Sequence, residues 1–143
     1  MKKLLFILMV GGLFGGFYIS PGFQLGVNSS KEFFLSYQTT FGLSSNIDVG
    51  LLSDIDGGFP GITLGRRHYK TGLNEWNSYN YIDAQIAFTT IGLGAGIIFD
   101  NSNIFYKYKL FTGFFGLATC DYVTFKDKPK IHFGAFGVYP ISD

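Results

Sequence analysis

The stretch that decides the fold is FYISPGFQLGVNSSKEFFLSYQTTFGL, residues Phe17 to Leu43, in which apolar and polar residues alternate twice around a short polar break. The apolar parity consists of Phe17, Ile19, Pro21, Phe23, Leu25 and Val27, then of Phe33, Leu35, Tyr37, Phe41 and Leu43. A period of two residues is that of a β-strand, and the break is short enough for a hairpin. The residues of the other parity are small and polar. One apolar and one polar face are typical of a membrane β-barrel, whose outer face contacts lipid and whose inner face contacts a polar interior.

The composition fits strands and turns rather than helices. The chain has 143 residues, enough for one domain, with 19% aromatic residues, 20 glycines and only 15% charged residues, against about 25% charged residues in a typical soluble domain. Beyond the N-terminus there is no apolar run of about 20 residues, which excludes a bundle of membrane-spanning helices. The net charge of +1 gives no reason to expect a nucleic-acid partner.

The first residues have the pattern of an export signal. Met1 to Lys3 form a short positive segment, and Leu4 to Val10 form an apolar segment of the length that secretory signals use. We expect a signal peptide over residues 1–12, with cleavage after Gly12 or a few residues later, by about residue 16, and a single domain over residues 13–143. An uncleaved anchor is the alternative, but this apolar stretch is short for a span and interrupted by glycines.

The alternation continues to the end of the chain and predicts an all-β fold, an antiparallel up-and-down barrel of about eight strands. The expected strands are residues 16–28, 32–44, 60–69, 79–89, 90–99, 103–112, 114–125 and 130–140. At Thr89 and Thr90 the apolar parity flips, which requires a turn or a bulge. If the chain ran on through Thr89 and Gly113 there would be six long strands, and six could not easily close around these side chains.

Two glycine-containing segments resemble ligand-binding motifs without their remaining parts. Asp54 to Gly58 resembles the start of a calcium loop but lacks the later ligands, so we interpret it as a solvated turn within a long loop over residues 44–58. Gly92, Gly94 and Gly96 resemble part of a dinucleotide fingerprint, yet no helix follows them. Glycine on alternate positions instead gives room inside a narrow barrel.

Basic and aromatic residues gather where the third expected strand ends and the fourth begins. The basic cluster consists of Arg66, Arg67, His68 and Lys70. It fits either a membrane rim near anionic head groups or a solvated strand end. The aromatic residues Trp76, Tyr79 and Tyr81 are of the types that form interfacial girdles, so we predict that they lie at the membrane surface.

Polar residues on the strands predict a polar interior. Lys107 and Lys109 would cost a few kcal/mol each against lipid, so we expect them inside or at the mouth, with Asp83 as a partner. Asp121 shares a parity with apolar residues, which requires a bulge or a place at the interface. The predicted interior network consists of Gln24, Gln38, Arg67, Asp83, Gln85 and Lys109. The simpler interpretation is that these groups only satisfy one another's hydrogen bonds.

The sequence gives no sign of catalysis, of a metal or of a cofactor. His68, His132 and Cys120 could supply a cysteine–histidine pair, but no motif spaces them. The single cysteine also excludes an internal disulfide, and we interpret it as a small apolar strand residue. We therefore do not expect an enzyme.

Over residues 16–140 the chain resembles the small eight-stranded outer-membrane β-barrel proteins. The resemblance is carried by the signal, the alternation, the aromatic content and the length, and by no motif. It implies an exported outer-membrane protein whose partner is the lipid bilayer, with a structural or adhesion-like role or one in holding a small apolar molecule. Many such proteins end in an aromatic residue, whereas this chain ends Tyr139-Pro140-Ile141-Ser142-Asp143. No functional residue can be transferred from the family.

The alternative is a secreted or periplasmic soluble barrel that binds a small hydrophobic ligand. It requires the apolar parity inside, around the ligand, and the polar parity outside. The polar parity here contains Ser, Gly, Gln, Thr and Asn instead of the many Lys and Glu usual on soluble barrels, which favours the membrane protein. The sequence identifies no ligand, no partner and no oligomeric state.

Overall fold

The computed structural model describes residues 17–43, 59–71, 75–88, 91–112, 118–138 and 141–142. The expected signal segment and the calcium-like turn at Asp54 to Gly58 lie outside these residues. Within the described ranges, no helix is long and apolar enough to cross a membrane. The strands are β1 (Phe17–Asn28), β2 (Phe33–Leu43), β3 (Phe59–Lys70), β4 (Trp76–Ala87), β5 (Ile91–Asp100), β6 (Asn103–Thr112), β7 (Ala118–Val123), β8 (Ile131–Val138) and β9 (Ile141–Ser142).

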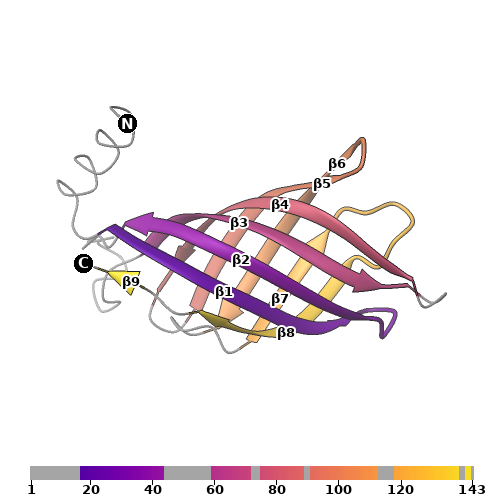
Figure 1. Ribbon diagram of the computed structural model, residues 1–143, viewed down its shortest axis with the longest axis horizontal. Helices are drawn as coiled ribbons and strands as arrows, with labels where there is room; N and C mark the ends of the chain where they lie inside the picture. The colour runs from indigo at the N-terminus through magenta and orange to yellow at the C-terminus, as the bar shows by residue number, and fades with distance from the viewer. Residues whose placement is uncertain are drawn as a thin grey trace.

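The strands form a closed barrel. Each strand from β1 to β7 pairs antiparallel with the next, and β8 closes the barrel by pairing with β1, from Gly22 opposite Val138 to Asn28 opposite His132 (Figure 1). The short β9 adds two residue pairs beside the start of β1. The predicted eight-stranded up-and-down barrel is therefore confirmed, and the six-stranded alternative is wrong. The parity flip near Thr89 falls between β4 and β5, where Phe88 N–H donates to the carbonyl of Ile91 at 2.8 Å.

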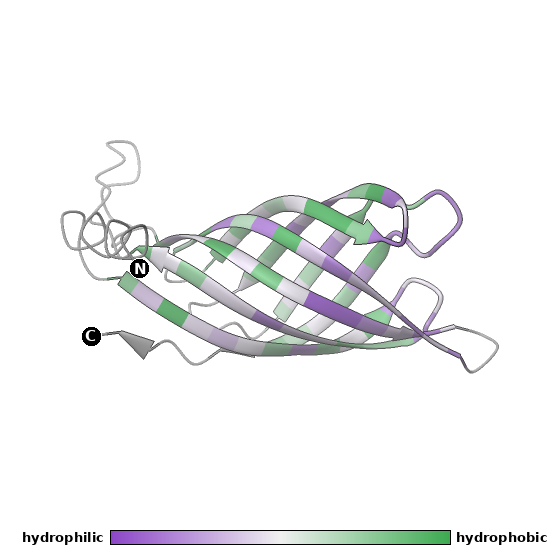
Figure 2. Cartoon of the chain, turned by 45° about the horizontal axis from the view of Figure 1, so that its top comes forward, coloured by the Kyte–Doolittle hydropathy of each residue, from purple (hydrophilic) through white to green (hydrophobic). Residues whose placement is uncertain are grey.

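The two ends of the barrel differ. At the turn end lie the connections over residues 29–32, 101–102 and 124–130, together with Lys70 at the end of β3, which pairs with Trp76 at the start of β4. At the opposite, terminal end β1 begins and β9 pairs with it (Figure 1). Hydrophilic residues gather toward the turn end, while hydrophobic residues alternate along the body of the strands (Figure 2). Among the described residues, the turn end is thus the more polar end of the barrel.

The two parities of the strands separate into an outer wall and an interior. Large apolar side chains point outward from all eight barrel strands and are exposed; examples are Phe23, Tyr37, Ile62, Ile82, Leu93, Tyr108, Tyr122 and Phe133. The inward positions are buried and largely polar or charged, among them Gln24, Ser36, Thr63, Arg67, Asp83, Lys107 and Asp121. This arrangement is the reverse of a soluble protein, in which the apolar face is buried.

Glycines facing inward make room for large rings on the neighbouring strand. Gly65 pairs with Tyr81 across β3 and β4, and a Cβ on Gly65 would lie 2.3 Å from the ring of Tyr81. Gly92 pairs with Phe111 in the same way, with a Cβ contact of 2.0 Å. Such contacts are impossible for any other residue, so these glycines let aromatic rings lie flat against the inside of the sheet.

The interior is filled in layers. An aromatic cluster near the turn end includes Phe34, Tyr69, Tyr79, Phe125 and Ile98. A smaller apolar cluster of Ala87, Phe111 and Phe136 lies on the other side, toward the terminal end. Charged and amide side chains occupy the space between these clusters. This central polar layer holds the candidate site.

Candidate functional site

Arg67 is the centre of the polar layer. Strand register places it beside Ser36 of β2, which in turn faces Gln24 of β1. Its Nε donates to Ser36 Oγ at 2.7 Å and its Nη2 donates to Gln24 Oε1 at 2.8 Å. Across the barrel, Nη2 donates to Asp121 Oδ2 at 2.5 Å and Nη1 lies 2.7 Å from His132 Nδ1. One fully buried guanidinium therefore links five strands of the barrel.

The carboxylate of Asp121 and the ring of Phe34 complete the surroundings of Arg67. The guanidinium carbon lies 4.2 Å from the centre of the Phe34 ring, a cation–π contact. Asp121 also accepts from Thr119 Oγ1 at 3.1 Å and from Gln24 Nε2 at 3.4 Å. A buried ion pair is tolerated only when its remaining hydrogen-bonding groups are satisfied in this way.

Lys107 forms a second ion pair beside the first. Its ammonium donates to Asp83 Oδ2 at 2.7 Å and lies 3.9 Å from Asp121 Oδ2. It also lies 3.7 Å from the centre of the Tyr81 ring. Lys107 therefore connects the two buried carboxylates, and the charges of the layer form one network rather than isolated pairs.

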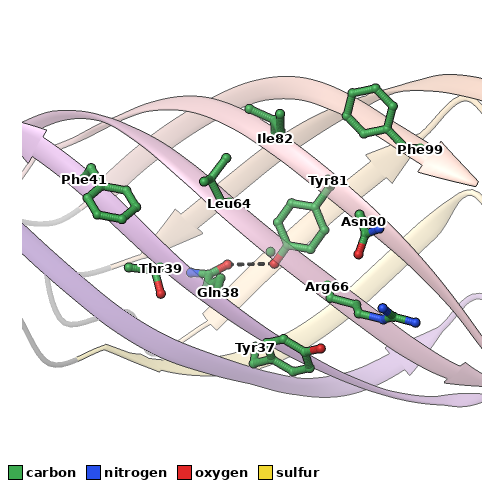
Figure 3. A pocket seen from close by; sticks show the side chains of 11 residues that line it. Tyr37, Gln38, Thr39, Phe41, Leu64, Arg66, Asn80, Tyr81, Ile82 and Phe99 are labelled. Atoms are coloured by element: carbon green, nitrogen blue, oxygen red, sulfur yellow. Dashed lines mark hydrogen bonds between the residues drawn. The ribbon is translucent and has the colours of Figure 1, made fainter. Parts of the chain in front are cut away.

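The terminal-end side of the layer is less tightly paired. Lys109 Nζ donates to Gln85 Oε1 at 3.5 Å and lies 5.1 Å from the ring centres of Phe111 and Phe136. In a separate contact, the Tyr81 hydroxyl donates to Gln38 Oε1 at 3.0 Å (Figure 3). Within the described residues, Lys109 has no carboxylate at ion-pair distance.

The six residues predicted for the interior network all face inward, but they do not all contact one another directly. Gln24 and Arg67 meet at the central ion pair, and Asp83 pairs with Lys107. Lys109 contacts Gln85, which is partly buried, and Gln38 contacts Tyr81. Sequence reasoning missed three central partners, Ser36, Asp121 and His132. The sequence signal that could have found them is strand parity: each of the three alternates with outward apolar residues and must therefore face the interior.

The predicted interfacial girdle is wrong for two of its three residues. Trp76 points outward and is 57% exposed, whereas Tyr79 and Tyr81 are buried inside the barrel, at 3% and 1% exposure. The reason is parity, because both tyrosines share a face of β4 with Asp83. Tyr79 packs against Phe125 with ring centres 5.6 Å apart, as part of the aromatic cluster.

Two further expectations about charged residues are corrected. Asp121 needs neither a bulge nor an interfacial place, since it is fully buried beside Arg67. The basic cluster is split by alternation: Arg67 faces inward, while Arg66 is on the outward face of β3. His68 and Lys70 share the outward parity with Arg66.

The residues considered for catalysis do not meet. Cys120 pairs with Phe133 on the outward parity of β7 and β8, while His132 faces the interior beside Asp121. His68 is on the outer face of β3, packed against Tyr37 with ring centres 5.7 Å apart. No group of three or more His, Cys, Asp or Glu side chains that could hold a metal ion occurs in the part of the chain that the structure describes.

The turn end is tied together by Lys128, in the connection between β7 and β8. Its ammonium donates to the carboxylate of Asp100 and, at 2.9 Å, to the hydroxyl of Tyr69. Burial disfavours the charged ammonium, but these two hydrogen bonds outweigh it and raise the pKa of Lys128. The connection is thus held to β5 and β3 by a charged contact.

Comparisons with known proteins give no relative. No family model, no curated protein and no solved structure matches the chain. A functional proposal therefore depends on the geometry alone.

Proposed function

We propose that this protein is a small outer-membrane β-barrel with a structural role, exported through its N-terminal signal, with lipid against its wall and no catalytic activity. The single observation that carries the proposal is the apolar wall. Exposed large hydrophobic side chains project from every one of β1 to β8. Soluble monomers rarely expose apolar patches larger than a few hundred Å².

The lengths of β1 to β6 support a bilayer crossing, while β7 and β8 are shorter, with 6 and 8 residues. The strands β1 to β4 have 11 or 12 residues, and β5 and β6 have 10. A transmembrane strand needs about 9–11 residues at a tilt of about 45°. A closed barrel also satisfies every backbone hydrogen bond inside its own sheet, as a bilayer requires.

The filled interior favours a structural role over transport. The polar layer around Arg67 is fully buried and crosses the barrel from β3 to β7 and β8. Aromatic side chains pack on its turn-end side. Small barrels of eight strands have an interior just wide enough for side chains to fill. The paired charges therefore act as internal cross-links that hold the wall in shape.

The soluble barrel with a hydrophobic ligand is the second candidate, and the arrangement of the two faces counts against it. It requires apolar side chains around an internal cavity, but Arg67, Asp83, Lys107 and Asp121 occupy the interior and are nearly inaccessible. It also requires a polar exterior, whereas the exterior has Phe23, Leu93 and their neighbours. Burying four charged groups around an apolar ligand would leave that ligand next to desolvated charge.

The test uses the single tryptophan. Trp76 is the only tryptophan of the chain and points outward, so its fluorescence reports contact with lipid. We expect brominated-chain phosphatidylcholine to quench Trp76 in reconstituted vesicles. We also expect the unboiled protein from an outer-membrane fraction to run faster on an SDS gel than the boiled protein.

A matched variant places the tryptophan deeper in the wall. Phe23 lies in the middle of β1 and is 56% exposed, so the double variant W76F/F23W should be quenched more strongly by bromines near the chain ends. A protein recovered in the soluble fraction, with one gel mobility and no quenching in either version, would refute the proposal. That result would favour the soluble barrel.

A further inference from the structure

The charges on the outer wall are confined to one strand. Of the outward strand positions that the structure describes, only Arg66 and Lys70 of β3 carry a full charge, and His68 lies between them. Neither cation is paired with a carboxylate within the described ranges. A cationic side chain on a lipid-facing wall costs up to a few kcal/mol toward the bilayer midplane. An anionic partner would therefore stabilise these two unpaired cations on an otherwise uncharged wall.

A groove of about 580 Å³ is lined in part by Arg66, and Lys70 lies four positions further along the same face of β3. The groove lies over two rows of residues that run across β2, β3 and β4. The apolar row is Thr39, Leu64 and Ile82, and the polar row is Tyr37, Arg66 and Asn80. On the outward face of β2, the small side chain of Thr39 lies between the large rings of Tyr37 and Phe41. This difference in size leaves a hollow at Thr39. Figure 3 shows Phe41 and Leu64 toward one end of the groove and Arg66 and Asn80 toward the other, where Phe99 also lies.

The polar end of the groove is arranged for an anion. Arg66 donates one hydrogen bond, from Nη2 to Ser78 Oγ at 2.9 Å, which orients the guanidinium and leaves other N–H groups for a ligand. Lys70 is two positions past His68 on the same face and pairs with Trp76, whose ring lies 6.3 Å from that of Phe33. Basic side chains bordered by aromatic rings are the usual surroundings of a lipid head group.

We propose that this groove binds one anionic phospholipid, with an acyl chain along Leu64 and Ile82 and the phosphate at Arg66 and Lys70. The inference rests on the proposed membrane location. A soluble anion would make no use of the apolar row. The head group of a zwitterionic lipid carries a positive charge as well, which Arg66 and Lys70 would repel. Planar guanidinium groups bind phosphate through two parallel hydrogen bonds, which a lipid phosphate can accept.

The experiment measures lipid retention. The full chain is reconstituted in bilayers of equimolar phosphatidylglycerol and phosphatidylcholine with identical acyl chains, and the lipid that stays bound is identified by native mass spectrometry. We expect the protein to retain phosphatidylglycerol in preference. R66Q should reduce that preference about fivefold, the effect of one basic side chain near a membrane surface. K126Q, which removes an exposed lysine from the connection between β7 and β8, is the control and should leave the preference intact.

A second variant tests the apolar row without changing charge. T39L fills the hollow and should lower retention of phosphatidylglycerol, while the unboiled gel mobility stays that of a folded barrel. Equal retention of the two lipids, or equal effects of R66Q and K126Q, would overturn the inference. If Trp76 is still quenched by brominated phosphatidylcholine in that case, the bilayer proposal stands and only the lipid site fails; if quenching is absent too, both fail.

Discussion

The substitution Asp121→Asn should be among the most damaging single changes in the interior. It keeps the shape of the side chain but removes the carboxylate that lies 2.5 Å from Arg67 and is fully buried. Removing one partner of a buried ion pair costs about 3–5 kcal/mol of unfolding free energy, because the other charge stays buried without compensation. The whole stability of a domain is about 5–15 kcal/mol, so D121N should lose a large part of it.

The geometry gives a smaller expected loss for Asp83→Asn. Lys107 loses its 2.7 Å partner in D83N but keeps Asp121 at 3.9 Å, so we expect roughly half the loss of D121N. Replacing both members of the central pair, in R67M/D121L, removes the uncompensated charge. This double variant should be more stable than D121N, since apolar replacement of a buried pair is often neutral or stabilising.

The assay is urea unfolding of the reconstituted protein at neutral pH. The folded fraction is read from the unboiled gel band, and Trp76 fluorescence provides a second probe whose transition should coincide with the first. A loss below about 1 kcal/mol in D121N, or a double variant less stable than D121N, would refute the assignment of the Arg67–Asp121 contact as a buried ion pair.

Five more substitutions test the wall and its packing. Gly65→Ala should cost about 1–3 kcal/mol because its Cβ would lie 2.3 Å from the ring of Tyr81, whereas Gly137→Ala, whose nearest contact is 3.7 Å, should be almost neutral; urea midpoints compare them. Tyr79→Phe removes a buried hydroxyl that has no hydrogen-bond partner and should leave stability unchanged or higher, while Tyr81→Phe should lose about 1 kcal/mol in the same titration. Cys120→Ser should leave folding intact, and in vesicles the native thiol should react with a charged maleimide only after unfolding, as mass spectrometry would show.

The strands could be predicted because alternation is a local property. The predicted bounds of the strands 32–44 and 103–112 differ by at most one residue from β2 and β6. Of the predicted seventh strand, 114–125, residues 118–123 form β7 and residues 124–125 follow it, while 114–117 lie outside the described residues. Asp121 fits this strand without a bulge, because it has the same parity as Thr119 and faces inward with it.

The contacts of the site could not be predicted, because they join residues far apart in the sequence. Periodicity indicates which side of the sheet a residue faces, but not which inward residues meet across the barrel. Arg67 and His132 are 65 positions apart, and strand stagger decides that they meet. The wrong prediction for Tyr79 and Tyr81 has a different cause. Tyrosine is a typical interfacial residue, but both tyrosines share the inward parity of Asp83, and parity decides where they lie.

The closure of the barrel by β1 and β8 has a consequence for how the protein is made. The first strand cannot complete its hydrogen bonds until the last has been synthesised, and Gln24 reaches Asp121 over 97 positions. Folding is therefore expected to be slow, because this ring closure carries a loop entropy cost that no early hairpin offsets. Until then one edge of β1 is unpaired and its apolar outer face is exposed to water. If the protein is exported as proposed above, such a chain would depend on chaperones between export and final assembly.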